Sequence, residues 1–202
     1  MSYNLIYNHK EWNNIMKKTK VVLLGDSIRL FGYGIKVPEL LGEEYEVFQP
    51  TDNCRFSKYL LHTLLDYKKE IDDADIIHFN AGEWDVSREF STDGRTFTSL
   101  EEYIDNMTRI VKYLKDKNKK LIFATTTPVL AHHYCNSNED IIKYNKAIVP
   151  VLMEMGVEIN DLFSLVSESP CDYIREDDAI HLSDKGIEVT AKQVAEHIRA
   201  LS

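Results

Sequence analysis

Residues 21–27 read Val-Val-Leu-Leu-Gly-Asp-Ser. Four consecutive apolar residues, closed by a turn, are typical of a strand that is buried on both faces of a sheet. The Gly-Asp-Ser corner that follows places the hydroxyl of Ser27 where this strand ends. In open α/β sheets ligands bind at the carboxyl ends of the strands, so Ser27 is a candidate nucleophile.

The rest of the chain alternates strand-like and helical stretches. Strands are predicted at 21–24, 45–48, 75–79, 121–124 and 157–159. Apolar residues recur with helical spacing at 60–65, 100–114 and 141–152, and in a closing helix from about 183 to 201 that Ser183-Asp184 can cap. This order predicts a three-layer α/β/α sandwich with a parallel sheet of about five strands, flavodoxin-like in strand order. The loops at about 81–98 and 126–138 are unusually long and lie at the carboxyl edge of this sheet.

Length, charge and cysteine content narrow the class of protein. A chain of 202 residues without repeats or a Pro/Gly-rich linker fits a single domain, with its core at about 20–200. A net charge of −9 argues against a nucleic acid or an anionic membrane as the main partner. The three cysteines lack a CxxC or zinc-ligand spacing and are expected to be free thiols. With no long apolar run at the N-terminus or later, a cytoplasmic location is expected.

A second segment, Asp178-Ala179-Ile180-His181, precedes the closing helix. A serine nucleophile needs a base within hydrogen-bond reach and a group that orients the base. Asp178 and His181 can form a local turn in which the carboxylate holds one ring nitrogen and the other nitrogen faces Ser27. The alternative for Ser27 is a helix N-cap, and the alternative for His181 is a surface or capping histidine.

Together these two segments make the chain resemble the GDSL or SGNH hydrolase family over about residues 20–200. The family is recognised by four short blocks, of which the first matches as Gly25-Asp26-Ser27, with Ile28 in place of the usual leucine, and the last as Asp178-Ala179-Ile180-His181. The resemblance implies that Ser27 is the nucleophile, His181 the general base and then acid, and Asp178 the orienting carboxylate.

The two middle blocks, which carry the family's oxyanion hole, match less well. The second reads Asn53-Cys54-Arg55-Phe56-Ser57-Lys58, with Lys58 at the position of a glycine whose backbone N–H donates. The third reads Gly82-Glu83-Trp84-Asp85, with Trp84 at the position of an asparagine donor. The oxyanion donors are therefore predicted to be the N–H groups of Ser27 and Lys58, with Trp84 or Asn80 as the third.

Further residues are expected around this site. Asp26 is expected to stabilise the turn, and Asp26, Gly82 and Thr127 to line the substrate pocket. Four aromatic residues suggest a rim suited to a sugar or an acyl chain: Phe31, Tyr33, Trp84 and Tyr134. The adjacent His132 and His133 are expected to contact solvent or substrate rather than a metal ion.

The sequence thus predicts a serine ester hydrolase that needs no metal or organic cofactor. A short acyl group such as acetyl on a carbohydrate is favoured, because no long apolar lid segment is present. Two alternatives stay open: an acyltransferase that uses the same triad, and a catalytically degenerate relative that binds a glycan. A nucleotide-binding protein is disfavoured, because no glycine-rich phosphate loop follows the first strand.

Overall fold

The computed structural model describes residues 17–202 and contains a parallel sheet of five strands in the order β2-β1-β3-β4-β5. All four strand pairs are parallel. The predicted fold is confirmed, and every expected strand is present: β1 Thr19–Leu24, β2 Tyr45–Phe48, β3 Ile76–Phe79, β4 Lys120–Ala124 and β5 Glu158–Asn160. The start of the chain, for which no apolar leader is expected, lies outside the described residues up to position 16.

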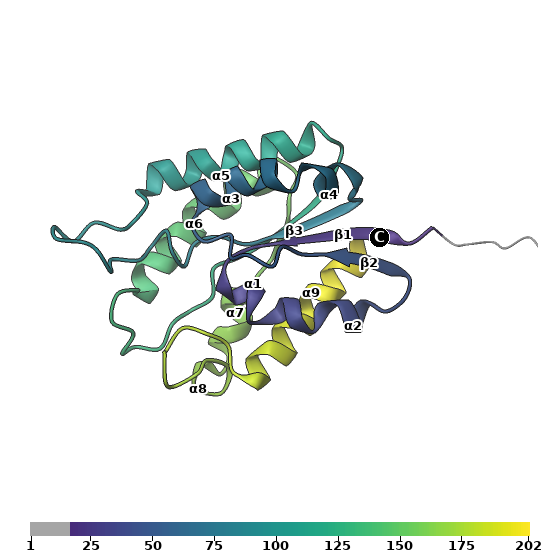
Figure 1. Ribbon diagram of the computed structural model, residues 1–202. Coiled ribbons are helices and arrows are strands. Elements are labelled where there is room, and N and C mark those ends of the chain that lie inside the picture. Colours follow the sequence, from purple (N-terminus) through teal and green to yellow (C-terminus); the bar gives the residue numbers. More distant parts are fainter. Residues whose placement is uncertain (1–16) are drawn as a thin grey trace, which may run out of the picture.

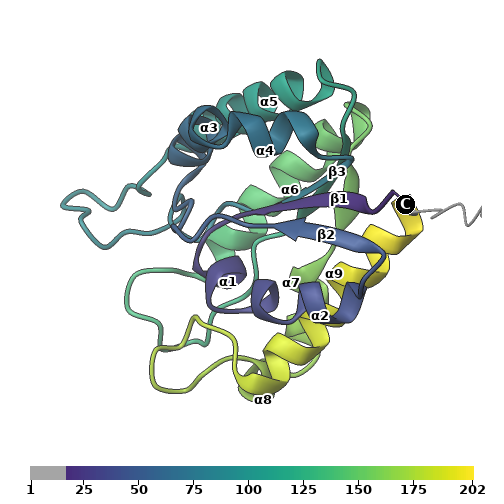
Figure 2. The same cartoon turned by 45° about the vertical axis from the view of Figure 1, so that its right-hand side comes forward.

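Helices cover both faces of the sheet (Figures 1 and 2). Strand β1 alternates its side chains between two cores: Val22 and Leu24 face one, and Val21 and Leu23 face the other. The first core is closed by α3 (Ser57–Asp66), α4 (Lys68–Asp73), α5 (Leu100–Lys115) and α6 (Asn138–Glu154). The second is closed by α2 (Val37–Leu41), α7 (Leu162–Ser167) and α9 (Asp184–Leu201).

The long helices follow the sequence pattern, while the short ones were not predicted. Helix α5 begins after Ser99, whose side chain accepts from the backbone of Glu102, and α9 begins after the expected cap Ser183. The short helices α1 (Ser27–Leu30), η1 (Tyr33–Ile35), α2, α7 and α8 (Pro170–Tyr173) have too few turns to produce an apolar periodicity.

Three connections gather at the carboxyl edge of the sheet, on the left of Figure 1. They are residues 80–99 after β3, 125–137 after β4, and 174–183 before α9. Because Leu24 pairs with Phe79, the chain leaves β1 and β3 side by side, and the N–H of Asn80 donates to the carbonyl of Leu24 at 3.2 Å. The Gly-Asp-Ser corner therefore lies next to the long loops at this edge of the sheet.

The described part of the chain has no helix that is long and apolar enough to cross a membrane. Cys54, Cys135 and Cys171 are free thiols, as expected.

Candidate active site

The corner after β1 presents Ser27 as the first residue of α1. Asp26 is the N-cap of this helix, and its Oδ1 accepts from the N–H of Ile28 at 2.9 Å. The turn role expected for Asp26 is confirmed, and the alternative in which Ser27 caps the helix is wrong, because Asp26 occupies that position. Gly25 is required here, since a Cβ would lie 1.9 Å from Oδ1 of Asn80.

A buried guanidinium supports the corner from behind. Arg29 is 0% exposed, and its terminal nitrogens donate to the carbonyls of Pro50 at 2.7 Å, Asp52 at 2.7 Å and Gly25 at 3.1 Å. The N–H of Cys54 also donates to the carbonyl of Gly25 at 3.0 Å. The loop before α3 is thus fastened to the serine corner. Sequence reasoning missed this residue, because an arginine is expected at the surface.

The segment before α9 forms the turn that the sequence predicts. Oδ2 of Asp178 lies 3.0 Å from Nδ1 of His181, and Oδ1 accepts from the N–H groups of His181 at 2.9 Å and Ile180 at 3.1 Å. Ala179 takes a left-handed backbone conformation, φ 62°, and its carbonyl accepts from the N–H of Leu130. Partial burial acts to raise the pKa of Asp178, but the three hydrogen bonds outweigh it and hold the pKa below its ordinary value.

One pocket of about 380 Å³ is lined both by the corner after β1 and by the turn before α9. Phe31, at the end of α1, also packs edge-on against the ring of His181 with centroids 6.2 Å apart. The pocket is lined by Ser27, Phe31, Asn53, Glu83, Trp84, Ser87, Glu89, His133, Tyr134, Cys135, Asn136, Asp178, Ile180 and His181. The predicted serine, histidine and aspartate therefore share one cavity, and Asp178 fixes Nδ1 of the histidine.

A buried acid forms part of the pocket wall. Glu83 is 3% exposed, and its carboxyl oxygens accept from Oγ1 of Thr127 and from Nδ2 of Asn136, each at 3.1 Å. Burial raises the pKa of Glu83 to about 8, and the nearby Asp26 acts in the same direction. Thr127, expected to contact substrate, thus supports Glu83. Gly82 is buried at φ 151° and has no space for a Cβ.

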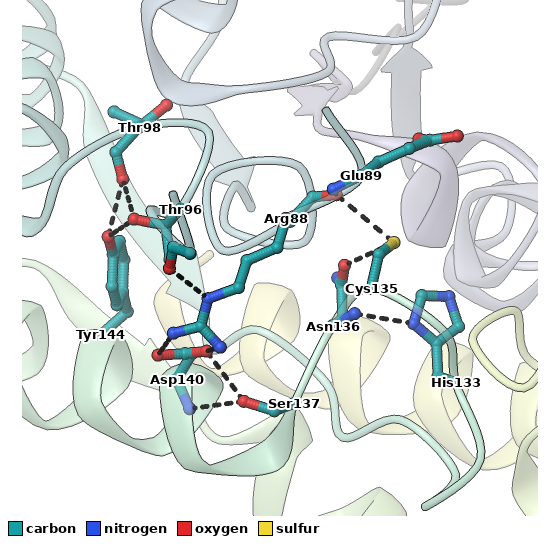
Figure 3. A network of polar contacts seen from close by, with 12 residues as sticks. Arg88, Glu89, Thr96, Thr98, His133, Cys135, Asn136, Ser137, Asp140 and Tyr144 are labelled. Atoms are coloured by element: carbon teal, nitrogen blue, oxygen red, sulfur yellow. Dashed lines mark hydrogen bonds and ion pairs between the residues drawn. The ribbon is translucent and has the colours of Figure 1, made fainter. Parts of the chain in front are cut away.

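The two long loops that carry this wall are joined by a polar network (Figure 3). The guanidinium of Arg88 contacts both carboxylate oxygens of Asp140, at 2.7 and 3.0 Å. The backbone N–H of Arg88 donates to the carbonyl of Cys135 at 3.0 Å. The hydroxyl of Tyr144 donates to the carbonyl of Thr98 at 2.6 Å. These contacts fix the loop after β3 to the loop after β4 and to helix α6.

A chain of buried polar groups runs beneath the corner. Nδ2 of Asn80 donates to Oδ1 of Asp26 at 2.8 Å, and Oδ1 of Asn80 accepts from the hydroxyl of Tyr33 at 2.7 Å. That hydroxyl lies 3.5 Å from Nδ1 of His78, whose Nε2 lies 3.2 Å from Nδ2 of Asn160. Burial lowers the pKa of His78 to about 3, so the ring is neutral, and an amide donor at Nε2 places its proton on Nδ1.

The structure places Tyr33 and Asn80 below the corner and away from the pocket surface. Tyr33 is fully buried, so it is not part of the aromatic rim, whereas Phe31, Trp84 and Tyr134 are exposed at the pocket. Asn80 is buried below the corner and lies outside the pocket lining.

The remaining predicted residues lie around the pocket. Trp84 lines it with 36% of its surface exposed. Lys58 lies in the first turn of α3, outside the pocket lining, and its side chain pairs with Glu102 at 2.9 Å. Its backbone N–H as an oxyanion donor stays a prediction. His133 lines the pocket, while Nε2 of His132 lies 3.3 Å from the carbonyl of Glu176.

Comparison with known proteins adds distant relatives. No protein-family model matches the sequence. The chain is 26% identical over 193 residues to the isoamyl acetate-hydrolyzing esterase 1 homolog of Homo sapiens, covering 84% of this chain and 77% of the human protein. It is 27% identical over 115 residues to a GDSL esterase/lipase of Oryza sativa subsp. japonica, covering 47% of this chain and 42% of the rice protein.

Solved structures share the fold. A lipase/acylhydrolase from Enterococcus faecalis matches with a TM-score of 0.74 at 18% identity, covering 90% of this chain and 96% of that chain. An acetyl xylan esterase matches with a TM-score of 0.73 at 20% identity, covering 89% of this chain and 99% of that chain.

The structure has a parallel sheet with a serine at the end of its first strand, and this serine lines the same pocket as a histidine that a carboxylate holds. With the distant relatives above, the chain is similar to the SGNH/GDSL-like hydrolases, a family of ester hydrolases. The resemblance drawn from the sequence is confirmed.

Proposed function

We propose that this protein hydrolyses short-chain acyl esters of uncharged hydroxylated compounds through an acyl-enzyme on Ser27. The observation that carries the proposal is the single pocket shared by Ser27 and the Asp178-bound His181. The oxygens of Asp178 also hold the backbone of the turn, so the carboxylate fixes both the position and the tautomer of the ring.

The first half of the reaction forms the acyl-enzyme. Oγ of Ser27 attacks the ester carbonyl carbon while Nε2 of His181 takes the hydroxyl proton. The carbonyl electron pair moves to its oxygen, which accepts from the N–H of Ser27 at the start of α1. When the carbonyl re-forms, the bond to the alcohol oxygen breaks and His181 returns the proton to that oxygen.

The second half releases the acid. Water attacks the acyl carbon, His181 takes a proton from the water, and the tetrahedral intermediate expels Oγ of Ser27, which regains its proton from His181. The two side chains that form the acyl bond and move the proton, Ser27 and His181, both line the pocket. The chemistry is complete without a metal ion or an organic cofactor.

The charges around the pocket favour uncharged substrates. Its lining includes the carboxyl groups of Glu83, Glu89 and Asp178 and, within residues 17–202, no lysine or arginine. Because the raised pKa of Glu83 keeps that group neutral near pH 7, Glu89 and Asp178 are the lining carboxylates that would repel an anionic ester. The exposed rings of Phe31, Trp84 and Tyr134 offer faces on which a sugar or a small apolar alcohol can pack.

The structural neighbours support an acetylated sugar as the substrate class. One is described as an acetyl xylan esterase, and another, with a TM-score of 0.69 and 19% identity, as an acetyl-xylooligosaccharide esterase from Geobacillus, covering 89% of this chain and 94% of that chain. Together with the pocket charges, these descriptions support acetylated neutral oligosaccharides as the first compounds to assay.

The test compares two serines of the same pocket. Ser87 also lines the cavity, but its hydroxyl contacts Sγ of Cys135 at 3.4 Å and its position lies on the loop after β3. We expect Ser27→Ala to reduce turnover of p-nitrophenyl acetate and of acetylated xylobiose by about 10⁴-fold or more. The matched Ser87→Ala variant is expected to keep turnover within about threefold of the wild type. Equal activity of Ser27→Ala and wild type would overturn the proposal.

The same assay separates the alternatives. A transferase would yield acetylated glycerol or sugar at the expense of acetate when the acceptor is added, with the same dependence on Ser27. A glycan-binding relative would bind xylo-oligosaccharides without releasing acetate from them. Acetate release that is independent of added acceptor supports hydrolysis.

A further inference from the structure

An oxyanion at the Ser27 site needs hydrogen-bond donors besides the N–H of Ser27. Two asparagines line the pocket, and they differ in what their side chains already bind. Nδ2 of Asn136 donates to the backbone carbonyl of Glu83 at 2.8 Å and to its Oε2 at 3.1 Å, which uses both hydrogens. Asn136 is therefore committed to the pocket wall.

In Asn53 the side-chain oxygen, and not the side-chain nitrogen, is the atom with a hydrogen-bond partner among the described residues. Its Oδ1 accepts from the N–H of Arg55 at 2.7 Å, and within the described residues no acceptor pairs with its Nδ2. Arg55 adopts φ 49°, a left-handed conformation that is uncommon for a residue with a side chain, and this turn brings its N–H back to Asn53. The amide oxygen is thereby fixed, and the two hydrogens on nitrogen are available to a ligand of the pocket.

The backbone around Asn53 is fastened to the serine corner at both neighbours. The carbonyl of Asp52 is held by the buried Arg29, and the N–H of Cys54 donates to the carbonyl of Gly25. Because Arg29 also donates to the carbonyl of Gly25, one guanidinium fixes the loop and the corner relative to each other. Asn53 is thus held in the same rigid unit as Ser27.

We propose that Nδ2 of Asn53 donates a hydrogen bond to the oxyanion formed when Ser27 attacks the ester, a role that rests on the proposed function. As Oγ of Ser27 bonds to the carbonyl carbon, the π electron pair moves onto the carbonyl oxygen and the Asn53 N–H stabilises that charge. No proton leaves Asn53, and the bond weakens again when the carbonyl re-forms. The donor lies on the loop before α3, whereas the sequence predicts Trp84 or Asn80, both after β3, as the third donor.

The test uses Asn53→Asp and Asn53→Ala. The aspartate keeps an oxygen that accepts from Arg55 and removes the N–H donor, so it separates catalysis from loop structure. We expect kcat for p-nitrophenyl acetate to fall by about 100- to 1000-fold in both variants, with KM within about threefold and an unchanged melting temperature for Asn53→Asp. Trp84→Phe, which keeps a ring and removes only the indole N–H, is measured beside them.

A thiono ester, in which C=S replaces the ester C=O, distinguishes a donor to the oxyanion from a residue that only supports the loop. Its C=S sulfur is a weak hydrogen-bond acceptor, so we expect the loss in Asn53→Asp to be at least about tenfold smaller on the thiono ester than on the oxygen ester.

Equal losses on the two esters would overturn the inference, as would a kcat for Asn53→Asp within about fivefold of wild type. A large loss in Trp84→Phe that the Asn53 variants do not share would assign the role to Trp84 and also overturn it. If the wild type and Asn53→Asp are both active, the role of Asn53 is wrong and the proposed function stands. If the wild type shows no Ser27-dependent turnover, the proposed function is wrong as well.

Discussion

Glu83→Gln is expected to change how stability depends on pH. The folded protein holds Glu83 protonated up to a pKa of about 8, against an ordinary value of 4.5. Below pH 4.5 the group is protonated in both the folded and the unfolded chain, and its contribution to stability is fully present. As pH rises towards about 8, the unfolded chain releases this proton while the folded chain keeps it, so stability is lost.

The size of the effect follows from the two pKa values. The interval between 4.5 and about 8, at about 1.36 kcal/mol per pH unit, corresponds to about 5 kcal/mol for a group that is 3% exposed. A glutamine matches the shape of the protonated acid: its oxygen can accept from Asn136, and its NH₂ can donate to Thr127. We therefore expect Glu83→Gln to be close to wild type in stability near pH 4.5 and more stable by several kcal/mol near pH 8.

The assay is urea denaturation of both proteins at intervals from pH 4.5 to 9. The difference in the free energy of unfolding between variant and wild type isolates Glu83, because Asp85, whose pKa burial raises to about 6, titrates in both proteins. A difference that stays constant across this range, or that shrinks as pH rises, would refute the reasoning.

Two other substitutions test the supports of the site. Tyr33→Phe removes the hydroxyl that donates to Oδ1 of Asn80, and leaving that buried oxygen unpaired is expected to lower the free energy of unfolding by about 1–3 kcal/mol; urea denaturation with a change below about 0.5 kcal/mol would contradict this. Arg88→Ala breaks the contact with Asp140 that joins the two pocket loops, and we expect a loss of about 1–2 kcal/mol with KM rising more than kcat falls. The control is Arg95→Ala, which removes an exposed ion pair on the same loop and is expected to change the free energy of unfolding by less than about 0.5 kcal/mol. If Arg95→Ala lost as much stability as Arg88→Ala, Arg88 would not have the role of joining the two loops.

The parts of the fold that sequence predicts are those with a local signal. Strand β1 is a continuous apolar run, α5 carries an apolar stripe over 16 residues, and both are found where the pattern places them. The Asp178-to-His181 turn is equally local, since its hydrogen bonds join residues two or three positions apart.

The parts that sequence reasoning missed depend on contacts between distant positions. Arg29 is buried because carbonyls 21 and 23 residues further along the chain surround its guanidinium. The pairing of Arg88 with Asp140 spans 52 residues. Tyr33 was expected at the rim of the pocket. The hydroxyl of Tyr33 instead donates to Asn80, which directly follows β3 and lies 47 residues further along the chain. The cytoplasmic location and the single domain stay predictions from the sequence.

The central claim is that Ser27 is the nucleophile and that His181 activates it. Its most direct test is treatment with a fluorophosphonate followed by peptide mass spectrometry, in the wild type, His181→Ala and Ser27→Ala. We expect one phosphonyl adduct on Ser27 in the wild type, labelling slowed by at least about 10³-fold in His181→Ala, and none in Ser27→Ala. An adduct on Ser87 or another residue with Ser27 unmodified, or labelling of Ser27 that proceeds at the same rate without His181, would contradict the account.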